Sequence, residues 1–315
     1  MLMQRGIREA DMTVTADDGT QLAGTLVMPS GPGPHPAVVL LWPTRMDREG
    51  DLGKARFAVG RTLAEALAAH GVASYRFDRR GVAGTPGQWR AATFLQNRSD
   101  SAAALRALAA RPEIAATGAI GHGEGALHAA WLGAHSSAAA VVMLAGHAMT
   151  GEQALHWWAE RAVADLPALS RLALRPLGRS PGEQVARLCA RIRATTADVA
   201  RVYGRRVNAG WLRQYLDYDP KPDLAAVGVP LLALTGDRDL QVSPDDLEVI
   251  AALVPGGEAR LLPGLTHTLR REQDPQALRA YGEQYQRPVD ALLVEQVASW
   301  SAAHLARVPV SGLAG

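Results

Sequence analysis

Three separated segments carry side chains that could do acid–base chemistry together. Asp239 follows a predicted strand, His267 follows the next one, and a short turn around Gly123 follows an earlier strand. A carboxylate that accepts a hydrogen bond from one ring nitrogen of a histidine fixes the tautomer and leaves the other nitrogen free to take a proton. Because parallel strands end at one edge of a sheet, we expect the three segments to meet. Asp237 is a competing candidate for the acid.

The turn has the sequence Gly121-His122-Gly123-Glu124-Gly125 and lies between a predicted buried strand and a predicted helix. Small residues two positions before and after the central residue let strand and helix pack closely around a strained turn, as in a G-x-S-x-G nucleophile elbow. Gly123 stands at the nucleophile position. Without a hydroxyl there is no acyl-enzyme chemistry, so the sequence excludes an ordinary serine-esterase mechanism. Glycine enters the strained backbone conformation freely, so the fold does not need a serine.

The elements that must position these segments alternate between strand and helix. A hairpin is predicted around Asp18-Gly19, followed by apolar runs typical of strands buried on both faces of a parallel sheet. Predicted strands are 12–16, 21–28, 37–42, 72–77, 117–120, 138–144, 229–235 and 259–262, and predicted helices are 57–70, 100–110, 125–132, 245–253 and 289–305. Short right-handed crossovers turn this alternation into an α/β fold with a doubly wound, mostly parallel sheet.

The alternation breaks between about Met149 and Asp219. Hydrophobic residues in this Arg- and Ala-rich stretch recur at helical spacing throughout, which predicts a helical cap inserted after the sixth strand. We therefore expect a core made of residues 1–148 and 219–315, and a helical cap made of residues 149–218.

Composition excludes several classes of protein. The 315 residues are 48% hydrophobic, and the 33 basic and 31 acidic residues are spread along the chain, which argues against a nucleic-acid partner. The single cysteine, Cys189, excludes an internal disulfide and a multi-thiolate zinc site, and its context is that of a buried structural thiol.

Metal-ligand spacing and a phosphate-binding glycine loop are both missing, so we expect no metal and no cofactor. The sequence carries no signal-peptide pattern and no membrane-length apolar run, which predicts a cytoplasmic protein without a membrane partner. The oligomeric state stays open.

Five ordered segments carry a resemblance to a known family: Asp47-Arg48-Glu49-Gly50, Arg76-Phe77-Asp78-Arg79-Arg80-Gly81, Gly121-His122-Gly123-Glu124-Gly125, residues 236–242, and Pro263-Gly264-Leu265-Thr266-His267. Together they resemble the α/β-hydrolase superfamily, nearest to its small bacterial carboxylesterases with an acyl-aminoacyl-peptidase-like core. The resemblance covers the chain apart from the cap. It implies the α/β-hydrolase fold, with Asp239 as the triad acid and His267 as the base.

The resemblance also implies an oxyanion hole formed by the backbone N–H of Glu124 and a second donor from the loop after Trp42. Pro43 has no N–H to give, which leaves Thr44 as the possible second donor. His122 is expected to be structural, and Asp47, Arg48, Asp78 and Arg80 are expected to form ion pairs that shape loops. The candidates for substrate contact are Trp42, His147, Glu152, Trp157, Trp158 and Trp211, although packing between cap and core explains the tryptophans equally well.

Two functions follow as alternatives. In the first, the protein is an enzyme without a covalent nucleophile, whose His267–Asp239 dyad acts as a general base on a mostly apolar small-molecule carbonyl or ester substrate. Elimination, isomerisation, cyclisation and water-mediated hydrolysis are all compatible with it, so a lyase in a biosynthetic pathway is one form of this hypothesis. In the second, the protein is a ligand-binding or scaffolding pseudoenzyme. An ordinary esterase whose serine had been replaced by design would give the same sequence.

Overall fold

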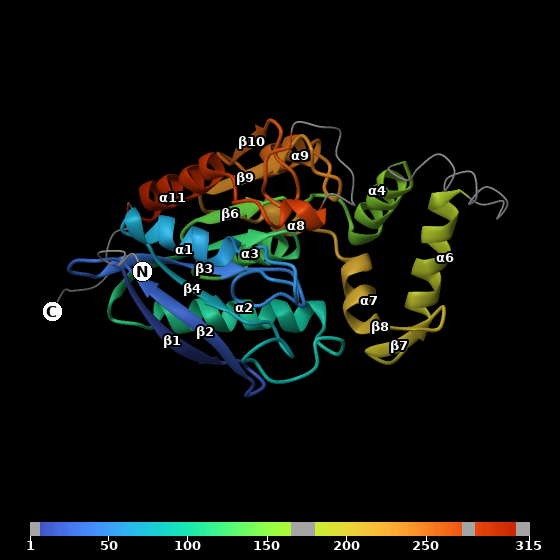
Figure 1. The fold of residues 1–315 in the computed structure, drawn as a ribbon, viewed down its shortest axis with the longest axis horizontal. Coiled ribbons are helices and arrows are strands. Elements are labelled where there is room, and N and C mark those ends of the chain that lie inside the picture. Colours follow the sequence, from blue (N-terminus) through green and yellow to red (C-terminus); the bar gives the residue numbers. More distant parts are fainter. Residues whose placement is uncertain (1–6, 165–179, 273–280, 307–315) are drawn as a thin grey trace.

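The computed structural model describes residues 7–164, 180–272 and 281–306. Its centre is an eight-stranded sheet in the order β1-β2-β4-β3-β5-β6-β9-β10 (Figure 1). The strands are β1 (Arg8–Thr15), β2 (Gln21–Met28), β3 (His35–Leu41), β4 (Ala73–Phe77), β5 (Ile114–His122), β6 (Val141–Leu144), β9 (Leu231–Gly236) and β10 (Glu258–Leu262). β2 pairs antiparallel with β1 and β4, and the other pairs are parallel. The predicted doubly wound, mostly parallel sheet is confirmed.

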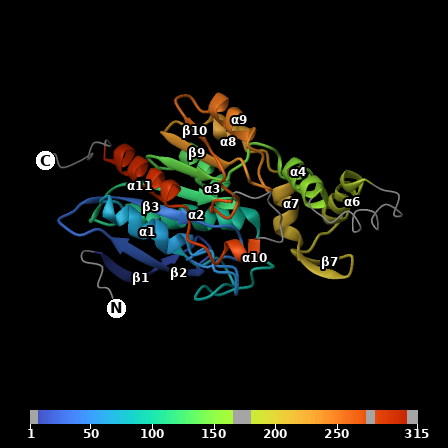
Figure 2. The same ribbon diagram turned by 45° about the horizontal axis from the view of Figure 1, so that its top comes forward.

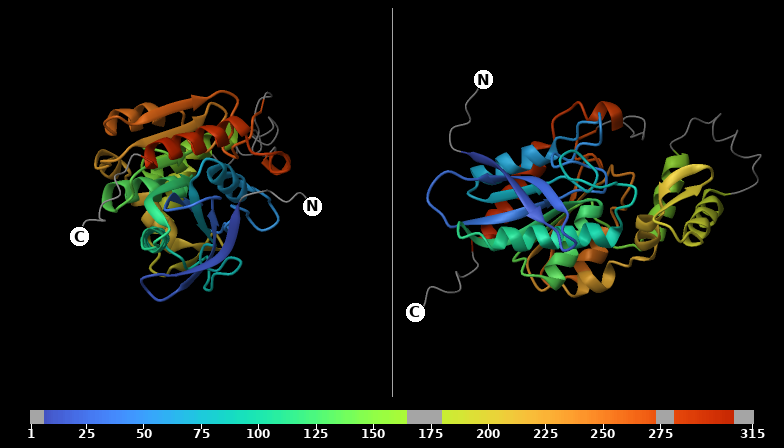
Figure 3. Two further views of the ribbon diagram at one scale, coloured as in Figure 1. Left: turned by 90° about the vertical axis from the view of Figure 1, so that its left-hand side faces the viewer. Right: turned by 90° about the horizontal axis from the view of Figure 1, so that it is seen from below.

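Helices cover both faces of the sheet (Figures 2 and 3). They are α1 (Val59–Ala69), α2 (Phe94–Ala109), α3 (Glu124–His135), α9 (Asp246–Leu253) and α11 (Ala291–Leu305), with the short α8 (Lys221–Ala225) and α10 (Tyr281–Gln284). α1 and α11 pack on one face, and α2, α3 and α9 pack on the other. Successive β3 side chains alternate between the two cores, with Val38 and Leu40 in one and Val39 and Leu41 in the other. This two-sided burial explains the continuous apolar run in the sequence.

The stretch after β6 lies beside the carboxyl end of the sheet, to the right in Figure 1. Its described elements are α4 (Gly151–Ala164), α6 (Pro181–Arg193), β7 (Val199–Val202), β8 (Arg205–Asn208) and α7 (Ala209–Asp217). They share a small core that includes the buried Cys189, and burial raises the pKa of its thiol to about 11. The division into core and cap domains at residues 149 and 218 stays a prediction.

The expectation of helix throughout this stretch is wrong, because β7 and β8 form an antiparallel hairpin. Tyr203 and Gly204 connect the strands with φ values of 48° and 76°. Two central residues with positive φ form the type of turn whose twist matches that of a hairpin. A tyrosine before the glycine is an unusual residue for this turn, which is why the sequence signal was weak.

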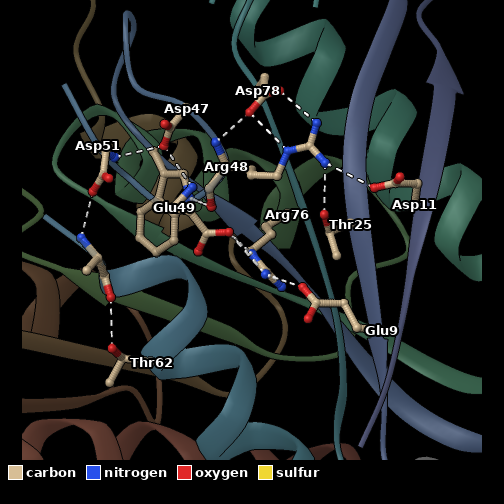
Figure 4. Close-up of polar contacts among 12 residues, drawn as sticks. Glu9, Asp11, Thr25, Asp47, Arg48, Glu49, Asp51, Thr62, Arg76 and Asp78 are labelled. Carbon is tan, nitrogen blue, oxygen red and sulfur yellow. Dashed lines mark hydrogen bonds and ion pairs between the residues drawn. The ribbon is translucent and has the colours of Figure 1, made fainter. Parts of the chain in front are cut away.

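Ion pairs hold the loops at the carboxyl ends of β3 and β4 (Figure 4). Arg48 donates to Asp78 through its main-chain N–H at 2.8 Å and through its guanidinium at 2.8 and 3.1 Å. Arg80 joins Asp100 and Asp18, so the expected loop-shaping ion pairs are present. Asp47 is an exception: its carboxylate instead accepts main-chain N–H groups within its own loop. The loop that carries Pro43 and Thr44 is therefore held firmly next to the elbow.

No described helix is both long enough and apolar enough to span a bilayer. No group of three or more His, Cys, Asp or Glu side chains in the described ranges is arranged to hold a metal ion.

Candidate active site

The elbow is a sharp turn between β5 and α3. Its centre, Gly123, has φ 55° and ψ −118°, outside the conformations that residues with a side chain adopt without strain. The flanking glycines permit close packing: a Cβ at Gly121 would lie 2.0 Å from the carbonyl oxygen of Gly125, and a Cβ at Gly125 would lie 2.0 Å from that of Leu41. Strand and helix therefore meet as the motif predicts.

The predicted acid and base are hydrogen-bonded. His267 Nδ1 lies 2.9 Å from Asp239 Oδ2, and the carboxylate side chain is fully buried. The other carboxylate oxygen accepts the main-chain N–H groups of Gln241 at 2.7 Å and Val242 at 2.9 Å. These bonds orient the carboxylate toward His267. Asp239 therefore accepts from Nδ1, which leaves Nε2 of His267 unprotonated in the neutral ring.

Asp237 does not reach the histidine. Its Oδ1 accepts the main-chain N–H of Gly264 at 2.6 Å and so joins the loops that follow β9 and β10. These two loops come together at Gly236, where a Cβ would lie only 1.9 Å from the carbonyl oxygen of Leu265. Of the two candidate acids, Asp239 is thus the one in contact with His267, and Asp237 holds the supporting loop.

His267 faces the elbow. A Cβ built on Gly123 would lie 3.8 Å from His267 Nε2 and 3.4 Å from Pro43 Cγ, both ordinary contact distances. The neighbouring His122 is buried, and its Nε2 lies 2.9 Å from the carbonyl oxygen of His267. Burial keeps the pKa of His122 well below its usual value. His122 is therefore a neutral donor that fixes the backbone of His267, in line with its expected structural role.

A cavity of about 220 Å³ opens at this point. It is lined by Pro43, Thr44, Gly123, Glu124, His147, Trp211, Tyr215, Gln241, Val242 and His267. Four of these residues were not predicted as site residues: Pro43, Tyr215, Gln241 and Val242. Tyr215 lies one helical turn after Trp211 on α7, so helical spacing from Trp211 was a signal that could have found it.

Glu124 joins four parts of the fold beneath the cavity. Its Oε1 accepts from Asn97 Nδ2, His128 Nε2 and Trp211 Nε1 at 2.9, 3.2 and 2.9 Å, and its Oε2 accepts the main-chain N–H of Thr44 at 2.7 Å. Burial alone would raise the pKa of this carboxyl, but the hydrogen bonds outweigh burial and lower the pKa to about 2. Glu124 therefore carries a fixed negative charge that ties α7 to the elbow.

This arrangement corrects the expected oxyanion hole. The N–H of Thr44 is already donated to the Glu124 carboxylate, so it is not free to stabilise an oxyanion. The main-chain N–H of Glu124 is different, because it belongs to the first residue of α3, where a helix offers no internal acceptor. Its role as the oxyanion donor stays a prediction.

His147 and Tyr215 form a second polar pair in the cavity wall. His147 Nδ1 lies 2.9 Å from the carbonyl oxygen of Met149, so this nitrogen carries the proton, and Nε2 accepts from the Tyr215 hydroxyl at 3.0 Å. Burial lowers the pKa of His147 to about 4, which keeps the ring neutral at pH 7. The Tyr215 ring stacks on Trp211 at a centroid distance of 4.7 Å. One wall of the cavity is thus aromatic with a single hydroxyl.

A family comparison agrees with this geometry. The family described as serine aminopeptidase, S33, a group of α/β-hydrolases, matches residues 58–274. The chain belongs to this family. The match takes in the elbow, Asp239 and His267. A search among proteins of curated function gave no match.

Solved structures share the fold of this S33-family chain. Est1E from Butyrivibrio proteoclasticus, with ferulic acid bound, aligns with a TM-score of 0.65 and 18% identity over 94% of this chain and 100% of that one. PA2218, a hypothetical protein from Pseudomonas aeruginosa, gives 0.64 and 17% over 96% of both chains. The esterase Pf2001 from Pyrococcus furiosus gives 0.59 and 16% over 96% and 91%. At these identities the likeness shows the fold alone.

Four expected substrate contacts in this S33-family chain do not line the described cavity. Trp42 is buried in the core, and its indole N–H donates to the carbonyl oxygen of Arg48 at 3.0 Å. On α4, Glu152 pairs with an arginine of α6, Trp157 lies beneath Arg161, and Trp158 is 38% exposed. The three residues on α4 do not reach the cavity because α4 packs against α6 and α7. Of the six candidates, His147 and Trp211 reach the cavity.

Proposed function

We propose that this chain is an α/β-hydrolase-fold enzyme that works without a covalent nucleophile and uses His267, held by Asp239, as a general base. The observation that carries the proposal is the position of His267 Nε2, 3.8 Å from where a side chain at residue 123 would begin. In a serine hydrolase the hydroxyl would occupy this space. With glycine there, a water molecule or a substrate C–H or O–H group takes its place in front of the base.

The proposed reaction is a proton transfer on a small, mostly apolar carbonyl or ester compound. His267 takes the proton, Asp239 supports the resulting imidazolium, and the N–H of Glu124 stabilises negative charge on the substrate oxygen. The aromatic wall of Trp211 and Tyr215 supports an apolar substrate. Elimination, isomerisation, cyclisation and water-mediated hydrolysis all satisfy this description.

A pseudoenzyme that binds a ligand without converting it is the second candidate. It is favoured by the engagement of the Thr44 N–H with Glu124, which leaves the cavity with one fewer main-chain donor for an oxyanion. Under this alternative, a bound ligand is recovered unchanged after long incubation, and His267→Ala leaves the affinity for it intact.

A test that needs no knowledge of the natural substrate uses 5-nitrobenzisoxazole. A base removes its carbon-bound ring proton, the N–O bond breaks, and a coloured cyanonitrophenolate forms. General-base catalysis contributes about 10²- to 10⁴-fold, and we expect His267→Ala to lose this part of the rate. Asp239→Asn should also lower the rate, whereas Asp237→Asn is the matched control and should leave it unchanged. If His267→Ala reacts as fast as the unmodified protein, the proposal is wrong.

A further inference from the structure

Two guanidinium groups contact one indole ring outside the cavity. Arg45 Cζ lies 4.2 Å from the centroid of the Trp89 ring, and Arg90 Cζ lies 4.3 Å from it. The indole attracts each cation, but the two cations repel each other. Partial burial and the charge of Arg90 both lower the pKa of Arg45. The backbone of Arg45 also has φ 71°, a left-handed conformation that costs energy for a residue with a Cβ. The fold thus holds two like charges together in a strained loop.

A third arginine, Arg206, lines one groove with Trp89 and Arg90. In the described ranges, Arg45, Arg90 and Arg206 form no ion pair, and their guanidiniums donate no hydrogen bond to protein. Nearby loops behave differently: the guanidiniums of Arg48, Arg76 and Arg80 are each paired with carboxylates, as Figure 4 shows for the first two. Arg90 and Arg206 are exposed, so their guanidinium donors face solvent and can bind a ligand.

A groove of about 290 Å³ lies beside two of these arginines, Arg90 and Arg206. It is lined by Gly81, Gly87, Gln88, Trp89, Arg90 and Arg206. Arg90 comes from the loop before α2, and Arg206 comes from β8 in the stretch after β6. The groove thus lies where this stretch meets the sheet-bearing part of the fold.

Two residues, Arg45 and Asn208, lie between the groove and the active-site cavity. Arg45 directly follows Thr44, which lines the cavity. On the other side, Asn208 donates to the carbonyl oxygen of Trp89 at 2.9 Å and accepts the main-chain N–H of Trp211, another cavity residue, at 3.0 Å. These contacts place the groove and the cavity on adjoining segments of the fold.

We propose that the groove binds an oxyanion group of the substrate, a carboxylate or a phosphate, while the apolar reactive part lies in the cavity beside His267. Arginine suits this role because its planar fork of N–H donors matches carboxylate and phosphate oxygens. That the bound molecule is the substrate rests on the proposed function. The groove then narrows the substrate class to acidic molecules with an apolar body. A neutral analogue of the same shape binds more weakly.

Calorimetry on the unmodified protein tests this with three probes: 6-phenylhexanoate, its neutral amide and 6-phenylhexyl phosphate. We expect both anions to bind more tightly than the amide, and their order tells carboxylate from phosphate. Arg90→Gln and Arg206→Gln should each weaken the binding of both anions by about three- to tenfold and leave the affinity for the amide unchanged. Arg61→Gln is the control, because Arg61 is an exposed arginine on α1 that lines neither site. Equal binding of acid and amide, or equal weakening of both by the variants, overturns the inference.

Competition links the groove to the active site. We expect 6-phenylhexanoate to inhibit the His267-dependent reaction of 5-nitrobenzisoxazole, and the inhibition to weaken in Arg90→Gln. Acid binding without inhibition would overturn the link to the substrate. The proposed function fails separately: if the reaction does not depend on His267 while the acid still binds more tightly than the amide, the groove stands as an anion site and the general-base proposal falls.

Discussion

Replacing Gly123 by serine tests the geometry of the site most fully. The new Cβ meets Pro43 Cγ at 3.4 Å and His267 Nε2 at 3.8 Å, so it fits without a clash. With a C–O bond of about 1.4 Å, the hydroxyl comes within hydrogen-bond reach of Nε2. The backbone at φ 55° and ψ −118° imposes strain on any residue with a side chain, so we expect a loss of about 1–3 kcal/mol in the free energy of unfolding.

The gain in esterase activity follows from what the site has and lacks. Loss of the nucleophile from an intact triad costs about 10⁶-fold in kcat. Because the Thr44 N–H is held by Glu124, the oxyanion hole has one donor fewer. The loss of such a donor lowers kcat by about 10²- to 10³-fold. We therefore expect Gly123→Ser to hydrolyse 4-nitrophenyl acetate about 10³- to 10⁴-fold faster than the unmodified protein.

Gly123→Ala is the matched control, because alanine imposes the same backbone strain without the hydroxyl. Urea unfolding should show similar destabilisation for the alanine and serine variants, and only the serine variant should gain activity. The double variant with His267→Ala should lose the gain. A folded Gly123→Ser that is no faster than Gly123→Ala would refute the claim that His267 faces this position.

The remaining predictions concern pH. Burial raises the pKa of Asp246 to about 6, and its Oδ2 has no partner in the described structure. The folded chain therefore holds this proton longer than the unfolded chain, and stability falls as the pH rises from about 4 to 6. Asp246→Asn should raise the free energy of unfolding by up to about 3 kcal/mol at pH 8 and by little near pH 4, as measured by urea unfolding; an equal effect at both pH values would contradict this. Burial lowers the pKa of His147 to about 4, so the unfolded chain takes up this proton first and stability falls as the pH drops from about 6.5 to 4. His147→Gln should reduce this fall in the free energy of unfolding by about 3 kcal/mol. If the variant loses as much stability between these pH values as the unmodified protein, His147 is not buried as a neutral ring.

The sequence predicted the fold because its signals are local and ordered. The apolar runs specify buried strands, and Gly121 and Gly125 specify the close strand–helix contact at the elbow. The pairing of Asp239 with His267 was equally accessible, since both follow neighbouring parallel strands. The resemblance favoured Asp239 over Asp237, and the structure shows the reason: both follow the same strand, but the loop turns only Asp239 toward His267.

The errors arose where a side chain from a distant segment decides the outcome. Thr44 has the right place in the chain for an oxyanion donor, but the Glu124 side chain takes its N–H. The tryptophans of α4 have helical spacing, yet that spacing does not say that α4 faces α6 and α7. The groove beside Trp89 combines the loop after β4 with β8, and no local pattern connects them.

The central claim is that His267 presents an unprotonated Nε2 to the space in front of Gly123. Nitrogen-15 NMR of the histidine side chains at neutral pH tests it directly, with His267→Gln to assign the signals. For the neutral ring, the structure predicts that the proton lies on Nδ1, toward Asp239, and that Nε2 is unprotonated. Binding of 5-nitrobenzisoxazole should shift the Nε2 resonance. A neutral ring protonated on Nε2, or an Nε2 signal unaffected by the bound probe, would contradict the account.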